Sequence, residues 1–327
     1  MKRLLSSMMV VVAVAALGAG LVPAAAADKL TVRLDFSPWG VQAAMHLAQN
    51  KGWFKEAGLD VDIQDGRGSG NTIQLVNAGQ VDVGQVQVGL VVSARAKGAT
   101  IRSIANFQRR TDLCILVDQD APINGPADLR GKTVVVFAAS PWAPFIDVYL
   151  KSAGMTRDDL KLDVVDPAAL WGTYLARRAD GLMSTVGSAL PIAEKSRPSK
   201  CLLASDANIA FPSYGLVARE DTIAGKGPAL RRLIEVEQRA WQDLRVNPED
   251  GVKAMIAERP DAQLDPVVLL GQIKLTLDYF DTPASKGKPI GWQAAEDWDA
   301  ALKSMEAAGV VRPGTKASDY YTNALIE

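Results

Sequence analysis

Histidine and cysteine are almost absent from this chain. Its 327 residues include one histidine, His46, and two cysteines, Cys114 and Cys201. A zinc site needs clustered histidine and cysteine ligands, and a Ser-His-Asp hydrolase needs a histidine beside its nucleophile. The sequence also lacks a Gly-x-Ser-x-Gly elbow, a Walker loop and an EF-hand ladder of acidic residues. We therefore expect no catalytic residue, metal or cofactor, and we interpret His46 as a packing or surface residue.

An excess of charge of one sign is missing as well. The chain carries 36 Lys and Arg against 37 Asp and Glu, for a net charge of −1. Neither a nucleic-acid-binding protein nor a polybasic membrane-surface protein has this balance. Beyond the N-terminus, no segment is apolar for the roughly 20 residues that a membrane-spanning helix needs. We expect neither a nucleic-acid partner nor direct membrane insertion.

The N-terminus has the pattern of a signal peptide. Lys2 and Arg3 precede an apolar run over 8–22, and small residues follow at 23–27. The run is shorter than the roughly 20 residues of a membrane anchor, and no nearby cysteine offers a lipid attachment point. We expect residues 1–27 to be removed, with cleavage near Ala27, and the mature chain to be a periplasmic monomer.

Export permits a disulfide between the two cysteines. Cys114 lies in the apolar run 113–117 and Cys201 in the apolar run 201–203. Free cysteine packs as a small apolar residue, so these positions favour two unpaired cysteines in buried strands. The sequence leaves their pairing open.

Strand and helix patterns alternate along most of the chain. Strands are expected at 30–35, 59–64, 81–83, 101–107, 133–137, 160–165, 181–184, 201–204 and 214–219. Helices are expected at 38–50, 72–78, 90–97, 141–152, 168–178 and 189–195, and then at 229–246, 247–258, 265–277 and 292–308. The same order of elements occurs in two halves. This pattern predicts an α/β fold with mostly parallel sheets.

The tripeptide Ser-Pro-Trp occurs twice, at 37–39 and at 140–142. Each copy follows an expected strand and opens an expected helix, with Ser suited to the N-cap and Pro to the first helical position. Free N–H groups at such turns bind small polar or anionic ligands. We expect the two turns to face each other across one cleft, so that Trp39 and Trp142 approach the same ligand. The alternative is two ordinary turns whose tryptophans pack in the core or at the rim.

A glycine-rich loop at 66–71 follows the second strand. It differs from a dinucleotide-binding fingerprint because Asn71 stands where the third glycine belongs. The loop is either a ligand contact, through N–H groups at the start of a helix, or a flexible surface turn.

Four stretches of this sequence carry a family resemblance. They lie at 34–38, 48–61, 72–84 and 128–134, and the second, which contains Lys51-Gly52-Trp53-Phe54-Lys55-Glu56-Ala57-Gly58-Leu59, is quite specific. They resemble the periplasmic substrate-binding proteins of ABC transporters. The branch is the one that binds thiamine pyrimidine precursors, aliphatic sulfonates, taurine and nitrate.

The resemblance implies a type II periplasmic-binding-protein clamshell, each lobe a mostly parallel sheet flanked by helices. Lobe one would comprise 28–113 plus 216–327, and lobe two 114–215. A small molecule would bind between the lobes and be delivered to a permease and its ATPase. The ligand-binding positions that it implies are Phe36, Ser37, Trp39, Gly68, Ser69, Gly70, Asn71, Gln85, Ser140, Trp142, Thr185 and Tyr214.

The sequence departs from the pyrimidine-binding pattern at 183–187. Those relatives often have a glutamate there that binds the aminopyrimidine edge, whereas this chain has Met-Ser-Thr-Val-Gly. Serine, threonine and helix N–H groups suit sulfonate, nitrate or carboxylate ligands, and the aromatic residues favour a flat ligand. We expect a flat aromatic or heteroaromatic solute, either neutral or anionic. An aliphatic sulfonate or taurine is the alternative.

An enzyme on the same fold is the alternative function. Fungal thiamine pyrimidine synthases resemble this chain and consume one of their own histidines, for which His46 is the available residue. Those enzymes carry a cysteine-rich iron-binding motif that is missing here. A sensor input domain is a third option, although no second module follows residue 327 in this sequence.

Overall fold

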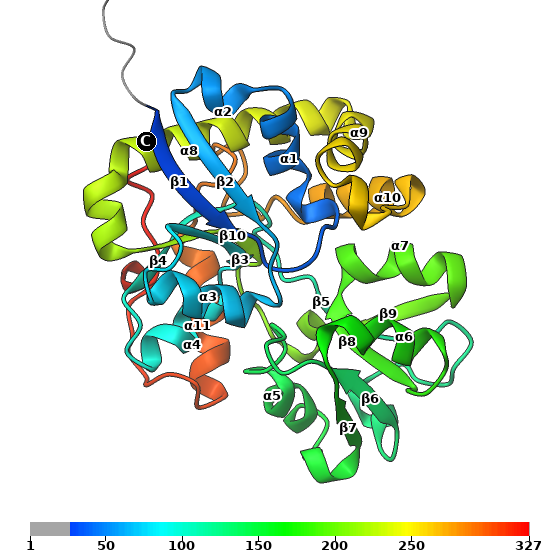
Figure 1. The fold of residues 1–327 in the computed structure, drawn as a ribbon. Coiled ribbons are helices and arrows are strands. Elements are labelled where there is room, and N and C mark those ends of the chain that lie inside the picture. The colour runs from blue at the N-terminus through cyan, green and yellow to red at the C-terminus, as the bar shows by residue number, and fades with distance from the viewer. Residues whose placement is uncertain (1–26, 327) are drawn as a thin grey trace, which may run out of the picture.

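The structure is a computed structural model that describes residues 27–326. Two five-stranded sheets lie side by side with helices around each of them (Figure 1). The predicted signal peptide lies outside the described residues except for Ala27. Within 27–326, no helix combines the length and apolar character that a membrane crossing requires.

The first sheet has the strand order β2-β1-β3-β10-β4. Strand β1 pairs in parallel with β2 and β3, whereas β10 pairs antiparallel with β3 and β4. The strands are β1 (Asp28–Arg33), β2 (Leu59–Gln64), β3 (Val83–Gln87), β4 (Ile101–Asn106) and β10 (Tyr214–Arg219).

The second sheet has the strand order β7-β6-β8-β5-β9. Strand β6 pairs in parallel with β7 and β8, and β5 pairs antiparallel with β8 and β9. The strands are β5 (Leu113–Asp118), β6 (Thr133–Val136), β7 (Lys161–Val164), β8 (Gly181–Thr185) and β9 (Ser199–Leu203).

Both sheets are therefore mixed, with four strands running in one direction and one reversed strand, β10 in the first sheet and β5 in the second, so the expectation of mostly parallel sheets is confirmed. The chain crosses between the sheets into β5 and back into β10. Leu113, which opens β5, pairs with the last residue of β8, and Tyr214, which opens β10, pairs with the last residue of β3. A strand that enters where its neighbour ends must run in the opposite direction.

Helices cover both faces of the first sheet and flank the second. The apolar face of the first sheet that includes Leu30, Val83 and Leu216 packs against α1, α8 and α9, and the opposite face packs against α3, α4 and α11. The helices are α1 (Ala43–Asn50), α2 (Trp53–Glu56), α3 (Ser69–Asn77), α4 (Leu90–Ala96), α5 (Ile146–Lys151), α6 (Leu170–Leu175), α7 (Val186–Ser196), α8 (Glu220–Val246), α9 (Pro248–Glu258), α10 (Pro266–Asp278) and α11 (Ala295–Ala307).

Both expected helices that open on Ser-Pro-Trp begin later than predicted. A 3₁₀ turn at Gly40–Gln42 precedes α1, and residues 141–145 form a turn before α5. Proline therefore does not occupy the first helical position in either turn. In contrast, α8 begins nine residues before the expected start at residue 229 and continues through Pro228 with a local break at Lys226.

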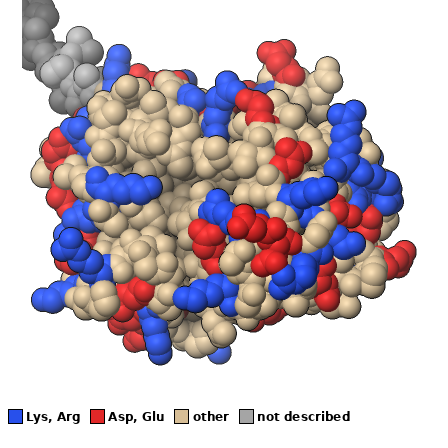
Figure 2. Space-filling view, turned by 90° about the horizontal axis from the view of Figure 1, so that it is seen from below, with Lys and Arg blue, Asp and Glu red and all other residues tan. Residues whose placement is uncertain are grey.

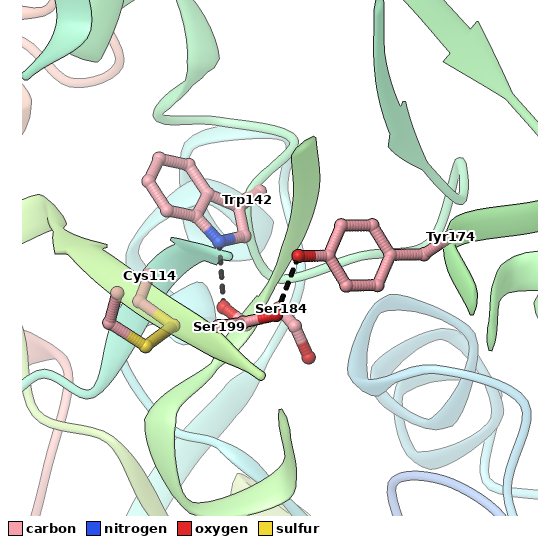
Figure 3. Close-up of a disulfide and its surroundings, with 6 residues drawn as sticks. Cys114, Trp142, Tyr174, Ser184 and Ser199 are labelled. Atoms are coloured by element: carbon pink, nitrogen blue, oxygen red, sulfur yellow. Dashed lines mark hydrogen bonds between the residues drawn. A yellow bond between two sulfur atoms is a disulfide. The ribbon is translucent and has the colours of Figure 1, made fainter. Parts of the chain in front are cut away.

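Cys114 and Cys201 form a disulfide between β5 and β9 (Figure 3). Their Cα atoms lie 5.4 Å apart, within the range of natural disulfides. The interpretation as two unpaired strand cysteines is wrong because both strands are antiparallel neighbours, a pairing that local sequence does not reveal. The bond ties the edge strand β9 to the strand that enters from the other sheet.

Candidate functional site

The strand ends of both sheets meet around a small cavity. Its volume is about 50 Å³, and it lies beyond the carboxyl ends of β1, β6 and β8. The lining residues are Asp35, Phe36, Trp39, Gly68, Ser69, Phe137, Ser140, Pro141, Leu170, Trp171, Ser184, Thr185, Ser188 and Tyr214. We call this set the cleft cavity. Its walls come from both sheets, as expected for a site at the carboxyl edges of strands.

Seven of the twelve sequence-predicted positions line the cleft cavity. They are Phe36, Trp39, Gly68, Ser69, Ser140, Thr185 and Tyr214. Gly70 and Asn71 instead line a second hollow of about 830 Å³, which also reaches Ser140. Ser37, Gln85 and Trp142 line neither of the two.

The second hollow lies between α3, α4 and the segment 138–144. Seen from below, the surface is hollowed among residues that are neither acidic nor basic, and a group of acidic residues lies beside the hollow with basic residues around it (Figure 2).

Trp39 is positioned by an acid and an amide rather than by a serine cap. Its indole N–H donates to the Asp35 carboxylate at 3.2 Å, and the Gln42 amide donates to the same carboxylate at 2.9 Å. The Gln42 amide oxygen accepts from the Trp39 backbone N–H at 3.3 Å. Ser37 is exposed and makes no cap. The N-cap prediction for Ser37 is therefore wrong, since Gln42 satisfies the backbone N–H from within the turn.

Tyr214 completes this wall from the second chain crossing. Its ring meets Trp39 edge-to-face at 5.2 Å between centroids. Burial raises the pKa of Asp35 to about 6, against the lowering effect of the hydrogen bonds from Gln42 and Trp39 and of the nearby Tyr214 hydroxyl. An acid thus sits in the wall of the cavity with its charge only partly compensated.

Trp142 lies behind its own turn. Its side chain is fully buried, and its indole N–H donates to the Ser184 carbonyl at 2.8 Å (Figure 3). Its ring packs edge-on against Tyr149. Ser140 and Pro141, the other two residues of the tripeptide, line the cleft cavity. The second turn therefore presents its serine and proline to the cavity and its tryptophan to the core.

The glycine-rich loop is a contact between the two halves. The Gly70 N–H donates to the Ala139 carbonyl at 3.3 Å, and Arg67 pairs with Asp166. Gly68 has φ +113°, and a Cβ there would come within 2.8 Å of the Phe137 ring. Glycine is therefore required at this position by both conformation and close approach.

Gln85 contributes to packing within the first sheet. Its amide donates to the Val41 carbonyl at 3.1 Å and approaches the Glu237 carboxylate, and the side chain is almost fully buried. Burial raises the pKa of Glu237 to about 8. Through this hydrogen bond to Val41, Gln85 stabilises the turn that follows Trp39.

Sequence reasoning missed several residues of the cleft cavity. Asp35 is the most informative, because it directly follows the β1 segment and is 3% exposed. A lone acid at the carboxyl end of a buried strand was a usable signal. Trp171, Leu170 and Ser188 carried none, since they lie on helices that local patterns place only roughly.

The remaining lining of the cavity combines aromatic residues with Ser, Thr, Gly, Pro and Leu residues. Phe36 and Phe137 approach each other across the cleft with centroids 5.5 Å apart, and Trp171 of α6 lines the side of the second sheet. Flat ligands are bound in such apolar, aromatic cavities with a few polar groups fixing their orientation. Within the described residues, no group of three or more His, Cys, Asp or Glu side chains is arranged to hold a metal ion.

His46 lies apart from this site. It is fully buried in α1, and it does not line either hollow. Burial lowers the pKa of His46 to about 3, so the ring is neutral. The expectation of a packing residue agrees with this position.

Comparisons with known proteins agree with this architecture. The formylaminopyrimidine-binding protein of Halalkalibacterium halodurans is 22% identical over 306 residues, covering 91% of each chain. The alkanesulfonate-binding protein SsuA of Xanthomonas axonopodis pv. citri, solved with MOPS bound, has a TM-score of 0.68 at 15% identity and covers 91% of this chain and 99% of its own.

A shorter stretch of the chain is similar to an enzyme. The 4-amino-5-hydroxymethyl-2-methylpyrimidine phosphate synthase THI11 of Saccharomyces cerevisiae is 30% identical over 107 residues, which cover 33% of this chain and 28% of the yeast protein. The family model described as NMT1/THI5 like matches residues 40–251, well over half of the chain. The chain therefore belongs to the NMT1/THI5-like family, and it has the type II periplasmic-binding-protein fold of its solved structural neighbours.

Proposed function

We propose that this protein captures a flat, nitrogen-containing heteroaromatic solute in the cleft cavity and delivers it to an ABC importer. The observation that carries the proposal is the Asp35 carboxylate beside the aromatic side chains of the cleft cavity, whose lining also includes Ser and Thr residues. A ring that stacks on these aromatic residues and presents an N–H edge to Asp35 would satisfy both features. The formylaminopyrimidine-binding relative supports this class of ligand.

The same carboxylate argues against the anionic ligand that the sequence allowed. A sulfonate or carboxylate beside Asp35 would add a second negative charge to a buried site, which is costly at low local dielectric. Protonation of Asp35, whose pKa is raised to about 6, would reduce this conflict only in acid. Sulfonates and taurine therefore serve as the contrasting ligands in the test.

We propose that residues 28–113 with 216–327, and residues 114–215, move as two lobes. Strand membership supports these bounds, since β1–β4 and β10 share one sheet and β5–β9 share the other. The glycine-rich loop and the pair Arg67–Asp166 close one side of the cleft. On the other side, the Gln272 amide of α10 donates to the Ser188 carbonyl of α7 at 3.0 Å. Ligand binding would shift the population toward this closed arrangement.

Export and delivery complete the proposal. The charge and apolar pattern of residues 1–27 supports secretion to the periplasm, where the mature monomer would dock on a permease coupled to an ATPase. The alternative is a pyrimidine synthase, which the partial similarity to the yeast enzyme favours. The buried position of His46 outside both hollows supports binding over that chemistry.

The test combines ligand screening with mass spectrometry. Thermal shift and tryptophan fluorescence would be measured with aminopyrimidines, the corresponding rings without amino groups, alkanesulfonates, taurine and aromatic acids. We expect aminopyrimidines to give the largest stabilisation, and native mass spectrometry of the purified protein to show a bound solute of that class. Preferential binding of sulfonates would contradict the ligand class, and a His46 modified after incubation with iron and pyridoxal phosphate would contradict the binding function.

A further inference from the structure

A second buried acid lies where the chain crosses between the sheets. Asp112 immediately precedes β5 and is fully buried, and Ser213 immediately precedes β10. The Ser213 hydroxyl donates to Asp112 Oδ1 at 2.6 Å, and the Gln87 amide donates to the same oxygen at 3.3 Å. One carboxylate oxygen thus receives two donors.

Three other polar atoms of this cluster have no hydrogen-bond partner in the part of the chain that the structure describes. Asp112 Oδ2, Gln87 Oε1 and Thr185 Oγ1 are buried and have no hydrogen-bond partner among residues 27–326. The Thr185 hydroxyl is near enough to Asp112 to lower the pKa of its carboxyl, although it lacks the geometry of a full hydrogen bond. Buried polar atoms are normally paired, and leaving a charged one unpaired costs more than leaving a neutral one.

This cluster is continuous with the cleft cavity. Thr185 lines the cavity and is 4% exposed. Tyr214 lies near both acids, because the charges of Asp35 and Asp112 both raise the pKa of its hydroxyl. Asp35 is also close enough to Asp112 for its charge to raise the pKa of the Asp112 carboxyl, which burial and this charge together bring to about 7.

We propose that Asp112, Gln87 and Thr185 form an inner subsite of the cleft cavity that takes a second amino or ammonium group of the solute. The inference rests on the proposed function and extends it. Gln87 Oε1 only accepts hydrogen bonds, and Asp112 Oδ2 only accepts them when the carboxyl is ionised, so a donor group satisfies both atoms. The solute is then a ring with two separated N–H donor groups, one facing Asp35 and one facing Asp112.

The charges around Asp112 suit a cationic group. Asp35 acts on it as a second negative charge, and Tyr214 and Tyr279 are the other titratable groups that face it. Arg110 stacks on the Tyr279 ring on the far side and interacts with that ring. An ammonium group between two carboxylates would stabilise both in the charged form.

The test uses three probes and two variants. The probes are 4-aminopyrimidine, 4-amino-5-(aminomethyl)pyrimidine and benzylammonium, with equal concentrations of NaCl and KCl as separate arms. The wild type should bind the diamine about 10–100-fold more tightly than 4-aminopyrimidine, as expected for a hydrogen bond to a charged group. Asp112→Asn should abolish this preference by lowering the affinity for the diamine to that for 4-aminopyrimidine. The exposed substitution Asp163→Asn on β7 is the charge-matched control and should preserve the preference.

Each result separates the subsite from the proposed function. If no pyrimidine binds, the ring class fails, and stabilisation by benzylammonium that Asp112→Asn removes still supports the subsite. Stabilisation by Na⁺ or K⁺ alone, or an unchanged diamine preference in Asp112→Asn, would overturn it. Thr185→Val repeats the test should Asp112→Asn fail to fold, and it should weaken diamine binding more than 4-aminopyrimidine binding.

Discussion

The two Ser-Pro-Trp turns have the same residues and opposite orientations. In the first turn Trp39 faces the cleft cavity and Ser37 faces solvent, whereas in the second turn Ser140 lines the cavity and Trp142 is in the core. The acceptors of the two indole N–H groups differ accordingly. Trp39 donates to the Asp35 side chain, and Trp142 donates to the Ser184 backbone. A shared tripeptide thus defines a turn without defining which of its side chains meets the ligand.

The largest expected difference between the turns is in stability. Trp142→Ala removes a fully buried indole from the core and should lower the free energy of unfolding by about 3–5 kcal/mol. Trp39→Ala removes a side chain that borders a cavity and should cost about 1–3 kcal/mol. Urea unfolding of both variants measures the loss in the free energy of unfolding. Equal losses would contradict the placement of Trp142 in the core and of Trp39 at the cavity.

The second difference is in pH dependence. Because the folded-state pKa of Asp35 is raised from 3.8 to about 6, the folded protein holds this proton more tightly than the unfolded chain. The resulting stabilisation, up to about 3 kcal/mol, is complete below pH 3.8 and is lost as the pH rises through 6.

Asp35→Asn should remove this component of the stability profile between pH 4 and 7. Trp142→Phe should lower the whole profile without changing its slope, since a backbone carbonyl does not titrate in this range. Chemical unfolding at several pH values compares the two variants, and an unchanged slope in Asp35→Asn would show that Asp35 is not the titrating group.

The third difference is in ligand affinity. Trp39→Ala should weaken binding of the solute by about 10–100-fold, as for a buried aromatic residue at a contact. Trp142→Phe should change affinity by less than about threefold, because the residue does not border the cavity. Calorimetric titration provides the measurement. A greater effect in the second turn would mean that Trp142 acts on the ligand after all.

The smallest effect concerns the loop between the turns. A side chain at Gly68 would meet Phe137 of the other half, so Gly68→Ala should hinder closure and weaken binding about tenfold. Gly98 has φ +92° and open space around its Cβ position, which makes Gly98→Ala a matched control for backbone strain. The control should lose about 1 kcal/mol of stability and no affinity. Equal affinity losses would attribute the effect to strain rather than to the contact.

Much of the fold was predictable because its signals are local. Alternating apolar residues indicated the strands, and family membership followed from contiguous stretches, whereas the signal peptide stays a prediction. The reversed strands β10 and β5 were not predicted, because strand direction depends on where the chain crosses between halves. The disulfide was missed for a similar reason, since Cys114 and Cys201 are 87 residues apart in sequence and meet only through the pairing of β5 with β9.

Part of the lining of the cleft cavity was predicted, and the role of these residues in ligand binding stays a prediction. Seven of the twelve positions line the cavity, and they lie at or just beyond strand ends or at the chain crossing. The acids were overlooked because Asp35 and Asp112 read locally as ordinary polar residues beside strands. Their importance comes from burial, which raises the pKa of both carboxyls.

The sequence by itself determined the order of elements, the two-part organisation and the family, because periodicity and contiguous motifs are properties of neighbouring residues. Only the tertiary structure decided which tryptophan faces the cleft. Trp39 is held toward the cleft by Asp35 and by Tyr214 from the second chain crossing. Trp142 is held in the core by Tyr149 and by the carbonyl of Ser184. Identical turns thus diverge because the orientation of a side chain depends on its partners in space.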